Sequence, residues 1–252
     1  MGTPLSILDY RQPVEFRIGE VITRSWTILS RHFLTFIMLV GIAELLPLLL
    51  NVYFSQQVHE VRSITDIDLW PLAIGLLTYI LAEFAHAIVI FAAFQDLRGK
   101  PVDAFESLGH GVTRLIPVLV ASVLVGLVVG IGCLLCLIPG LIALTAMAVV
   151  VPACVVERMG PIESMSRSAD LTTGHRWPIL GVAFAWGLII IVVSLAIGAA
   201  MAGTSSLATQ IFTWIWQVLS GSFTAVYSAI LYHDLRAVRE GIGIDEIASV
   251  FD

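Results

Sequence analysis

Charged residues are scarce in this chain, and their scarcity decides its class. Only 13% of the 252 residues are Asp, Glu, Lys or Arg, whereas 58% are hydrophobic; a soluble domain carries about 25% charged residues. The few basic residues form no run of the kind that binds nucleic acid. One core in a chain of this length cannot bury so much apolar surface. The composition therefore excludes a soluble globular protein and requires lipid to cover the chain.

The sequence also lacks the common motifs of catalysis. It has no Gly-x-Ser-x-Gly elbow, no His-Glu-x-x-His pair and no phosphate-binding loop, so enzymes that depend on these motifs are excluded. Only three cysteines are present, and Cys133 and Cys136 form a Cys-x-x-Cys pair. We interpret this pair as small apolar filler, and a thiol-redox role stays open. No cleavable signal peptide is evident near the start. We expect no enzymatic activity and no cofactor.

Six long apolar stretches dominate what the sequence does contain. They lie at about 33–54, 70–94, 115–137, 141–157, 177–202 and 207–232. A spanning helix needs roughly 20 apolar residues, and these stretches are continuously apolar rather than alternating, which favours helices over strands. The sequence therefore predicts an all-α fold with six transmembrane helices in a single membrane domain over residues 1–252.

The basic residues indicate on which side of the membrane the connections lie. Twelve of the thirteen Lys and Arg residues fall at the two ends of the chain and in alternate connections, and only Arg62 lies in a loop on the other side. Loops rich in Lys and Arg stay in the cytoplasm. We therefore expect a multi-pass protein of the bacterial inner membrane with both termini cytoplasmic.

An amphipathic stretch precedes each odd-numbered apolar stretch, so the chain repeats one plan three times. These amphipathic stretches begin near Ile18, Val102 and Ile162, and helices of this kind lie in the membrane interface. The exits of the second and sixth apolar stretches also match, with Gln95-Asp96-Leu97-Arg98 against His233-Asp234-Leu235-Arg236. Three parallel repeats are predicted at about 15–100, 101–160 and 161–241, followed by a tail at 242–252. Secondary transporters more often contain inverted repeats, so parallel repeats count against a transporter without excluding one.

Proline and glycine mark the predicted turns and one close contact between helices. Leu137-Ile138-Pro139-Gly140 and Gly203-Thr204-Ser205-Ser206 are predicted to form tight turns, because Pro fixes φ and Gly permits a positive φ. Gly126 and Gly130 form a Gly-x-x-x-Gly pair, which is typical of close helix packing in membranes.

Several motifs resemble a known family. They include Leu137-Ile138-Pro139-Gly140, Val156-Glu157-Arg158, Gly160-Pro161-Ile162-Glu163, Thr173-Gly174-His175-Arg176-Trp177 and Tyr232-His233-Asp234-Leu235-Arg236. With these motifs the chain resembles the membrane domain of glycerophosphoryl diester phosphodiesterases and related bacterial integral membrane proteins. Those enzymes hydrolyse phosphodiesters in a separate soluble barrel, which has no counterpart in these 252 residues. The resemblance implies a non-enzymatic scaffold or accessory subunit in lipid or envelope handling, with membrane lipids and other membrane polypeptides as partners.

Three ionisable side chains fall deep within the apolar stretches. They are Glu44 in the first stretch, and Glu83 and His86 in the second. A charge at the bilayer centre costs roughly 2.5–3.5 kcal/mol, so each of these groups needs a partner or a role. Glu83 and His86 share a helix face, and Tyr79 lies one turn away. We predict that a polar stripe on the sixth stretch faces them; its members are Gln210, Thr213, Gln217, Ser220, Thr224 and Tyr227.

Three interpretations of these groups stay open. They can be a hydrogen-bonded part of the structure with protonated carboxyls, the site of a proton- or cation-linked small-molecule transporter, or a metal site. Glu83-x-x-His86 is half of a di-iron pattern that needs a second Glu-x-x-His, which the sequence lacks, so we predict no metal. The candidate ligand or proton site consists of Glu44, Glu83, His86, Tyr79, Gln217, Ser220 and Thr224.

Overall fold

The computed structural model describes residues 18–57, 70–203 and 205–240, and these residues form helices without any strand. This confirms the all-α fold. The predicted loop around Arg62 and the tail at 242–252 lie outside the described residues. In chain order the helices are α1 (Ile18–Arg31), α2 (Phe33–Gln57), α3 (Trp70–Leu97), α4 (Ala104–Leu135), α5 (Leu137–Ala146), α6 (Val150–Val156), α7 (Pro161–Leu171), α8 (Arg176–Ala200) and α9 (Ser206–Glu240).

Five segments of the described chain are long and apolar enough to cross a membrane. They are Phe33–Phe54, Pro71–Leu97, Ala104–Leu135, Leu137–Val156 and Arg176–Ala200, and they correspond to the first five predicted spans. The fourth segment is broken between α5 and α6, because Pro152 lacks the N–H that would bond to the carbonyl of Ala148 and its ring collides with that carbonyl. The sixth predicted span falls within α9, whose polar stripe makes it less apolar than the other five.

The connection between α4 and α5 is tighter than the sequence predicts. Only Cys136 is extended, with φ −166° and ψ 142°, and α5 begins at once, so the predicted turn at residues 137–140 is wrong. Pro139 is tolerated there because it lies in the first helical turn. Gly140 instead permits a close crossing: a Cβ at this position would lie 2.2 Å from Cys133 Sγ.

The predicted packing role of Gly126 and Gly130 is also wrong. A Cβ at either position would meet no atom within 4 Å, whereas a Cβ on Gly132 would lie 3.0 Å from the Cα of Gly140. The close contact therefore sits at the hairpin end of α4 and uses a different pair of glycines. A glycine spacing in sequence does not show which face of the helix has a partner.

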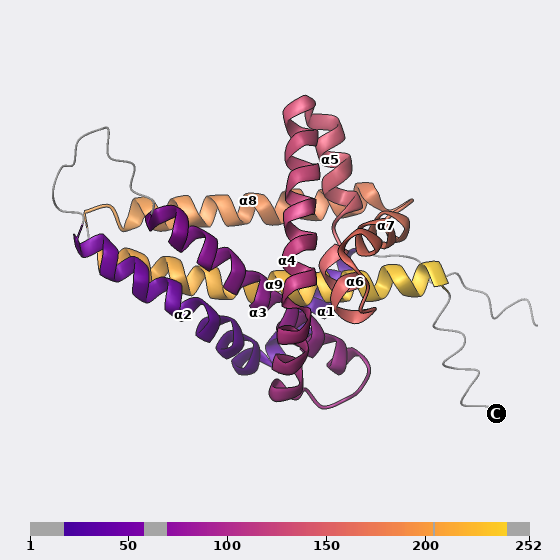
Figure 1. The fold of residues 1–252 in the computed structure, drawn as a ribbon, viewed down its shortest axis with the longest axis horizontal. Helices are drawn as coiled ribbons and strands as arrows, with labels where there is room; N and C mark the ends of the chain where they lie inside the picture. Colours follow the sequence, from indigo (N-terminus) through magenta and orange to yellow (C-terminus); the bar gives the residue numbers. More distant parts are fainter. Residues whose placement is uncertain (1–17, 58–69, 204, 241–252) are drawn as a thin grey trace, which may run out of the picture.

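Helix α9 is the axis around which the other helices are arranged. It packs against α1, α2, α3 and α8, while α3 also packs against α4. In Figure 1, α8 and α9 run along the long axis of the molecule, α2 and α3 are inclined to them, and the α4–α5 hairpin rises across them. Small residues let the backbones approach at the centre, and those that are fully buried include Ala85, Ala92, Ala93, Ala225 and Ala229.

The matching Asp-Leu-Arg segments near the ends of α3 and α9 bind α1 and the beginning of α2. Asp96 of α3 lies 2.9 Å from His32 Nε2 and 3.4 Å from Arg31 Nη1. Asp234 of α9 accepts a hydrogen bond of 2.8 Å from Arg24 Nη1. The aspartate of the repeated Asp-Leu-Arg motif thus has the same role in both helices: it binds basic side chains of α1 and the beginning of α2.

Of the three predicted interfacial stretches, two form separate helices. They are α1, whose buried stripe of Val21, Ser25, Ile28 and Leu29 packs on the bundle, and α7. The stretch after Val102 is different, because it continues without a break into the spanning helix α4. Asp103 caps the start of α4 by accepting from the N–H groups of Phe105 and Glu106, so the helix begins there rather than near residue 115.

Candidate functional site

A first cavity lies between α2, α3 and α9, toward the C-terminal end of α2. It has a volume of about 500 Å³. Glu44 points into it from α2 and is only 6% exposed. The other polar residues that line it come from all three helices and are Asn51, Thr78, Thr209, Gln210, Thr213 and Gln217.

A second, smaller cavity of about 220 Å³ borders the first. The two share Glu44, Thr78 and Gln217 in their linings. The second cavity adds His86, whose ring lies against α9 at Gly221: a Cβ there would sit 3.6 Å from His86 Nε2. Ser220 and Thr224 complete its polar lining.

A third cavity of about 340 Å³ is lined by residues of α3, α5, α6, α8 and α9, including Thr145 of α5. It shares His86 and Thr224 with the second cavity. Its carboxyl group is Glu83, whose Oε2 accepts a hydrogen bond of 2.9 Å from Ser122 Oγ of α4. On the opposite wall, Trp186 Nε1 donates to Thr224 Oγ1 at 3.0 Å.

The three cavities follow one another along α9, and we call them together the polar path. Their shared residues connect Glu44 to His86 and His86 to Glu83. The predicted stripe of α9 lines the path from Gln210 to Tyr227. Residues of this stripe thus line the same cavities as Glu44, His86 and Glu83.

Two side-chain donors next to the polar path are buried without a hydrogen-bond partner in the described part of the chain. Trp214 Nε1 beside the first cavity and Tyr227 Oη beside the third have no hydrogen-bond partner among the described residues. Buried polar groups without a partner are rare, and each costs several kcal/mol in hydrocarbon. Both donor atoms are themselves covered by neighbouring side chains, so water in the cavities reaches them only if those side chains move.

The lining also determines which ligands the path suits. The described residues that line the three cavities include two carboxyls, one imidazole and several hydroxyls and amides, with no Lys or Arg. Such a lining attracts cations and hydrogen-bond donors rather than anions. No group of three His, Cys, Asp or Glu side chains in the described part of the chain is arranged to hold a metal ion.

One predicted site residue lies beside the cavities, next to Glu83 and Ser122, and two residues that support the site escape prediction. Tyr79 lines none of the three cavities and is 37% exposed. Ser122 and Trp186 hold Glu83 and Thr224 in place. In the sequence, Ser122 is a single hydroxyl in the apolar part of α4, and this alone does not predict which residue it contacts.

The whole path lies within one recognisable sequence region. A family model described as "Domain of unknown function (DUF7847)" matches residues 34–235. The chain belongs to the DUF7847 family. No curated protein and no solved structure matches the chain. The predicted resemblance to the phosphodiesterase membrane domain stays a prediction.

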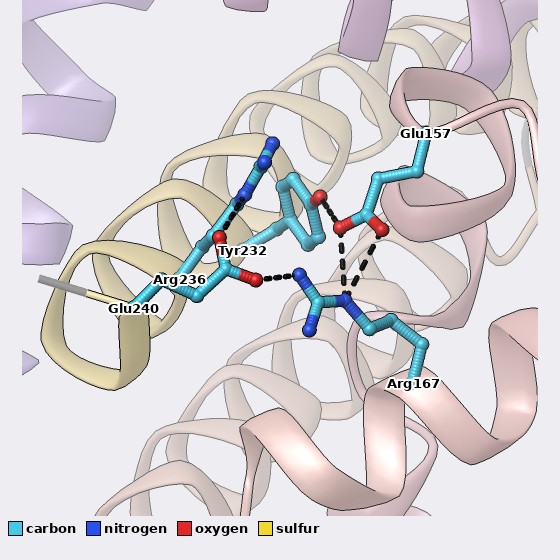
Figure 2. Close-up of polar contacts among 5 residues, drawn as sticks. All are labelled: Glu157, Arg167, Tyr232, Arg236 and Glu240. Atoms are coloured by element: carbon cyan, nitrogen blue, oxygen red, sulfur yellow. Dashed lines mark hydrogen bonds and ion pairs between the residues drawn. The ribbon is translucent and has the colours of Figure 1, made fainter. Parts of the chain in front are cut away.

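The DUF7847 region contains every residue that lines the polar path, whereas α1 lies before it. A separate cluster, which we call the clamp, joins α6 and α7 to the end of α9. It is formed by Glu157, Arg167, Tyr232, Arg236 and Glu240 (Figure 2). Arg167 Nε donates to both carboxylate oxygens of Glu157, at 3.0 and 3.1 Å. The hydroxyl of Tyr232 also donates to Glu157.

The other half of the clamp is the carboxylate of Glu240. It accepts from Arg167 Nη2 and, at 2.7 Å, from Arg236 Nε. Burial favours the neutral form of Glu240, but these two hydrogen bonds outweigh it and lower the pKa of Glu240. Likewise, burial opposes the charge of Arg167, yet its bonds to Glu240 and Glu157 raise the pKa of Arg167 above its ordinary value. Because the clamp groups are paired with one another, we interpret it as a fastening of α6 and α7 to α9.

Proposed function

We propose that α9 is a sixth transmembrane helix and that both termini are cytoplasmic, in the inner membrane of a bacterium. With 35 residues, α9 is about 52 Å long at the usual rise per residue, which exceeds the roughly 30 Å of the hydrocarbon core. The distribution of Arg and Lys supports the orientation. In this topology the three units are α1–α3, α4–α6 and α7–α9, and the α4–α5 hairpin, which lies across α8 and α9 in Figure 1, has to tilt toward them to cross the same bilayer.

The proposed function is proton- or cation-linked transport of a small polar molecule along the polar path, without enzymatic chemistry. The observation that supports it is the succession of three neighbouring cavities, whose linings share residues from Glu44 through His86 to Glu83. Apolar packing that sealed these groups would have favoured a purely structural role. Instead, each group borders open space of a size that water or a small solute occupies.

The physical logic of such a path is that it lowers the cost of charge within the membrane. An ionised carboxyl facing hydrocarbon is expensive, whereas one facing a water-filled cavity is not. Glu44 and Glu83 can each release a proton and bind a cation, and His86 between them can accept and pass on a proton. The hydroxyls and amides of α9 supply hydrogen bonds to the moving solute.

The test is an ion-flux measurement on vesicles that contain the purified protein and an internal pH-sensitive dye. With imposed proton, Na⁺ or K⁺ gradients as probes, the protein should dissipate a pH gradient faster than empty vesicles do. Glu44→Gln and Glu83→Gln should slow this by about tenfold, because loss of one charged hydrogen bond to the moving ion raises a barrier by roughly 1.5 kcal/mol. Asp170→Asn, an exposed acid on α7, is the matched control.

The opposite result would favour the scaffold role that the family resemblance implies. If the wild-type protein conducts no more than empty vesicles, and both glutamine variants reduce only folding yield, the path has no transport function. Reproducible purification of another membrane polypeptide with the chain would then direct attention to its lipid-facing helices.

A further inference from the structure

An apolar groove of about 560 Å³ lies against a neighbouring face of α9, next to the face that lines the first cavity. It is formed by α1, the start of α2, α8 and α9, and its aromatic lining includes Trp26, Phe33, Trp186, Trp216 and Phe223. Ligand-binding cavities have volumes of about 300–1,000 Å³, so the groove is large enough for a hydrocarbon chain. Gly181 of α8 leaves part of it open, because a Cβ there would meet nothing within 4 Å.

The groove and the polar path are separated by single side chains. Trp186 lines the groove and also the third cavity, and Ser220 lines the groove and also the second cavity. The indole of Trp186 is held between Phe223, at 4.5 Å between ring centroids, and the hydroxyl of Thr224. An apolar surface and a polar surface thus meet across one ring.

Lipid tails alone give no reason for specific binding in this groove. A hydrocarbon chain is already surrounded by apolar material in the bilayer, so moving it into an apolar groove yields little free energy. Any preference must come from a head group that reaches the polar path. The nearby carboxyls of Glu83 and Glu44, with no Lys or Arg among the described lining residues, favour an amine over a phosphate or carboxylate.

We propose that the groove and the polar path together bind an amphiphile with one hydrocarbon chain and an amine head group. The chain lies along the groove against Trp26 and Trp216, and the head passes Trp186 to reach His86 and Glu83. This inference rests on the proposed function, because it names the substrate class of the same path. Trp186 is the positioning residue between the two compartments.

The experiment uses a long-chain alkylamine with a photoreactive diazirine in its chain, added to the full-length protein in phosphatidylcholine nanodiscs. The alkyl phosphate of equal chain length is the comparison probe. We expect saturable labelling of α8 and α9 peptides by the amine, and at least about tenfold weaker labelling by the phosphate, equivalent to roughly 1.4 kcal/mol. Glu83→Gln should reduce this preference while tail labelling remains.

Two glycines of α8 supply a matched pair of variants. Gly181→Leu places a side chain in the groove and should abolish saturable labelling, whereas Gly198→Leu, which also meets open space but lies outside the groove, should leave it unchanged. Equal or non-saturable labelling by both probes, or labelling that Gly181→Leu does not alter, would overturn the proposal.

The amphiphile and the transport function can fail separately. If the amine probe does not bind but Glu83→Gln still slows proton flux, the amphiphile is overturned and transport along the path stands. If the probe binds as described but the wild-type protein conducts no more than empty vesicles, the site is a lipid site and the transport proposal is wrong.

Discussion

Replacing Gly140 by Ala should destabilise the α4–α5 hairpin. The new Cβ would lie 2.2 Å from Cys133 Sγ, 2.6 Å from its backbone nitrogen and 2.7 Å from its Cα. Two of these three atoms belong to the backbone, so the side chain cannot simply rotate away and the two helices must move apart. Overpacking of this kind costs about 1–3 kcal/mol, and contact with the backbone places this case at the upper end.

The net effect on stability can be worked out from opposing terms. Removing a glycine from a helix contributes about 0.5–1 kcal/mol of stabilisation, which leaves a net loss of about 2 kcal/mol. A chain of this size loses about 2–4 °C in Tm per kcal/mol, so the Tm should fall by about 4–8 °C. The assay is thermal unfolding in detergent, followed by tryptophan fluorescence.

The control for this prediction is Gly130→Ala on the same hairpin. A Cβ at Gly130 meets nothing within 4 Å, so only the gain from helix propensity applies and the Tm should stay constant or rise slightly. If Gly140→Ala is as stable as Gly130→Ala, the close crossing of α4 and α5 is wrong.

Three further predictions concern the clamp and the polar path. Arg167→Met leaves the two clamp carboxylates without their shared donor and should lower the free energy of unfolding by about 1–3 kcal/mol, as measured by thermal unfolding. Arg24→Met breaks an exposed ion pair and should lower it by only about 0–1 kcal/mol. Equal losses in the two variants would contradict the clamp. The pKa of Glu240 is lowered from 4.5 in the folded protein, so the ionised carboxylate stabilises the fold fully above the unfolded pKa, and this stabilisation disappears as pH falls through the folded pKa. The Tm difference between wild type and Glu240→Gln should therefore shrink below pH 4.5, and a constant difference would refute this. Gly187→Leu fills open space in the third cavity and should slow proton flux in vesicles, while Gly198→Leu should not.

Most of the fold follows from two properties of the sequence. Long apolar stretches and the placement of Arg and Lys predict the helices, and the first five spans agree with the structure. Helix packing is predicted less well, because a glycine motif shows small residues but not their partner. Gly126 and Gly130 face no neighbour, while Gly132 and Gly140 make the close contact.

The candidate site was partly predictable for a similar reason. Ionisable groups in apolar stretches must be compensated, so the encounter of Glu44, Glu83 and His86 with the α9 stripe could be expected from physical chemistry. The contribution of Trp186 depends on how α8 packs against α9, and that depends on many weak apolar contacts. Tyr79 lies close to Glu83 and Ser122 as its spacing predicts, but it lines none of the cavities, because a helix face is broad.

Access of water to the polar path is the central claim, and thiol labelling tests it most directly. In a protein whose Cys133, Cys136 and Cys154 have been replaced, Thr213→Cys and Thr224→Cys would be treated with a small hydrophilic thiol reagent in nanodiscs. Ser222→Cys is the control, because Ser222 is fully buried on the same helix and lines none of the three cavities. The account predicts rapid modification at Thr213→Cys and Thr224→Cys and none at Ser222→Cys. If Thr224→Cys is as unreactive as Ser222→Cys, the path is dry and the account is wrong.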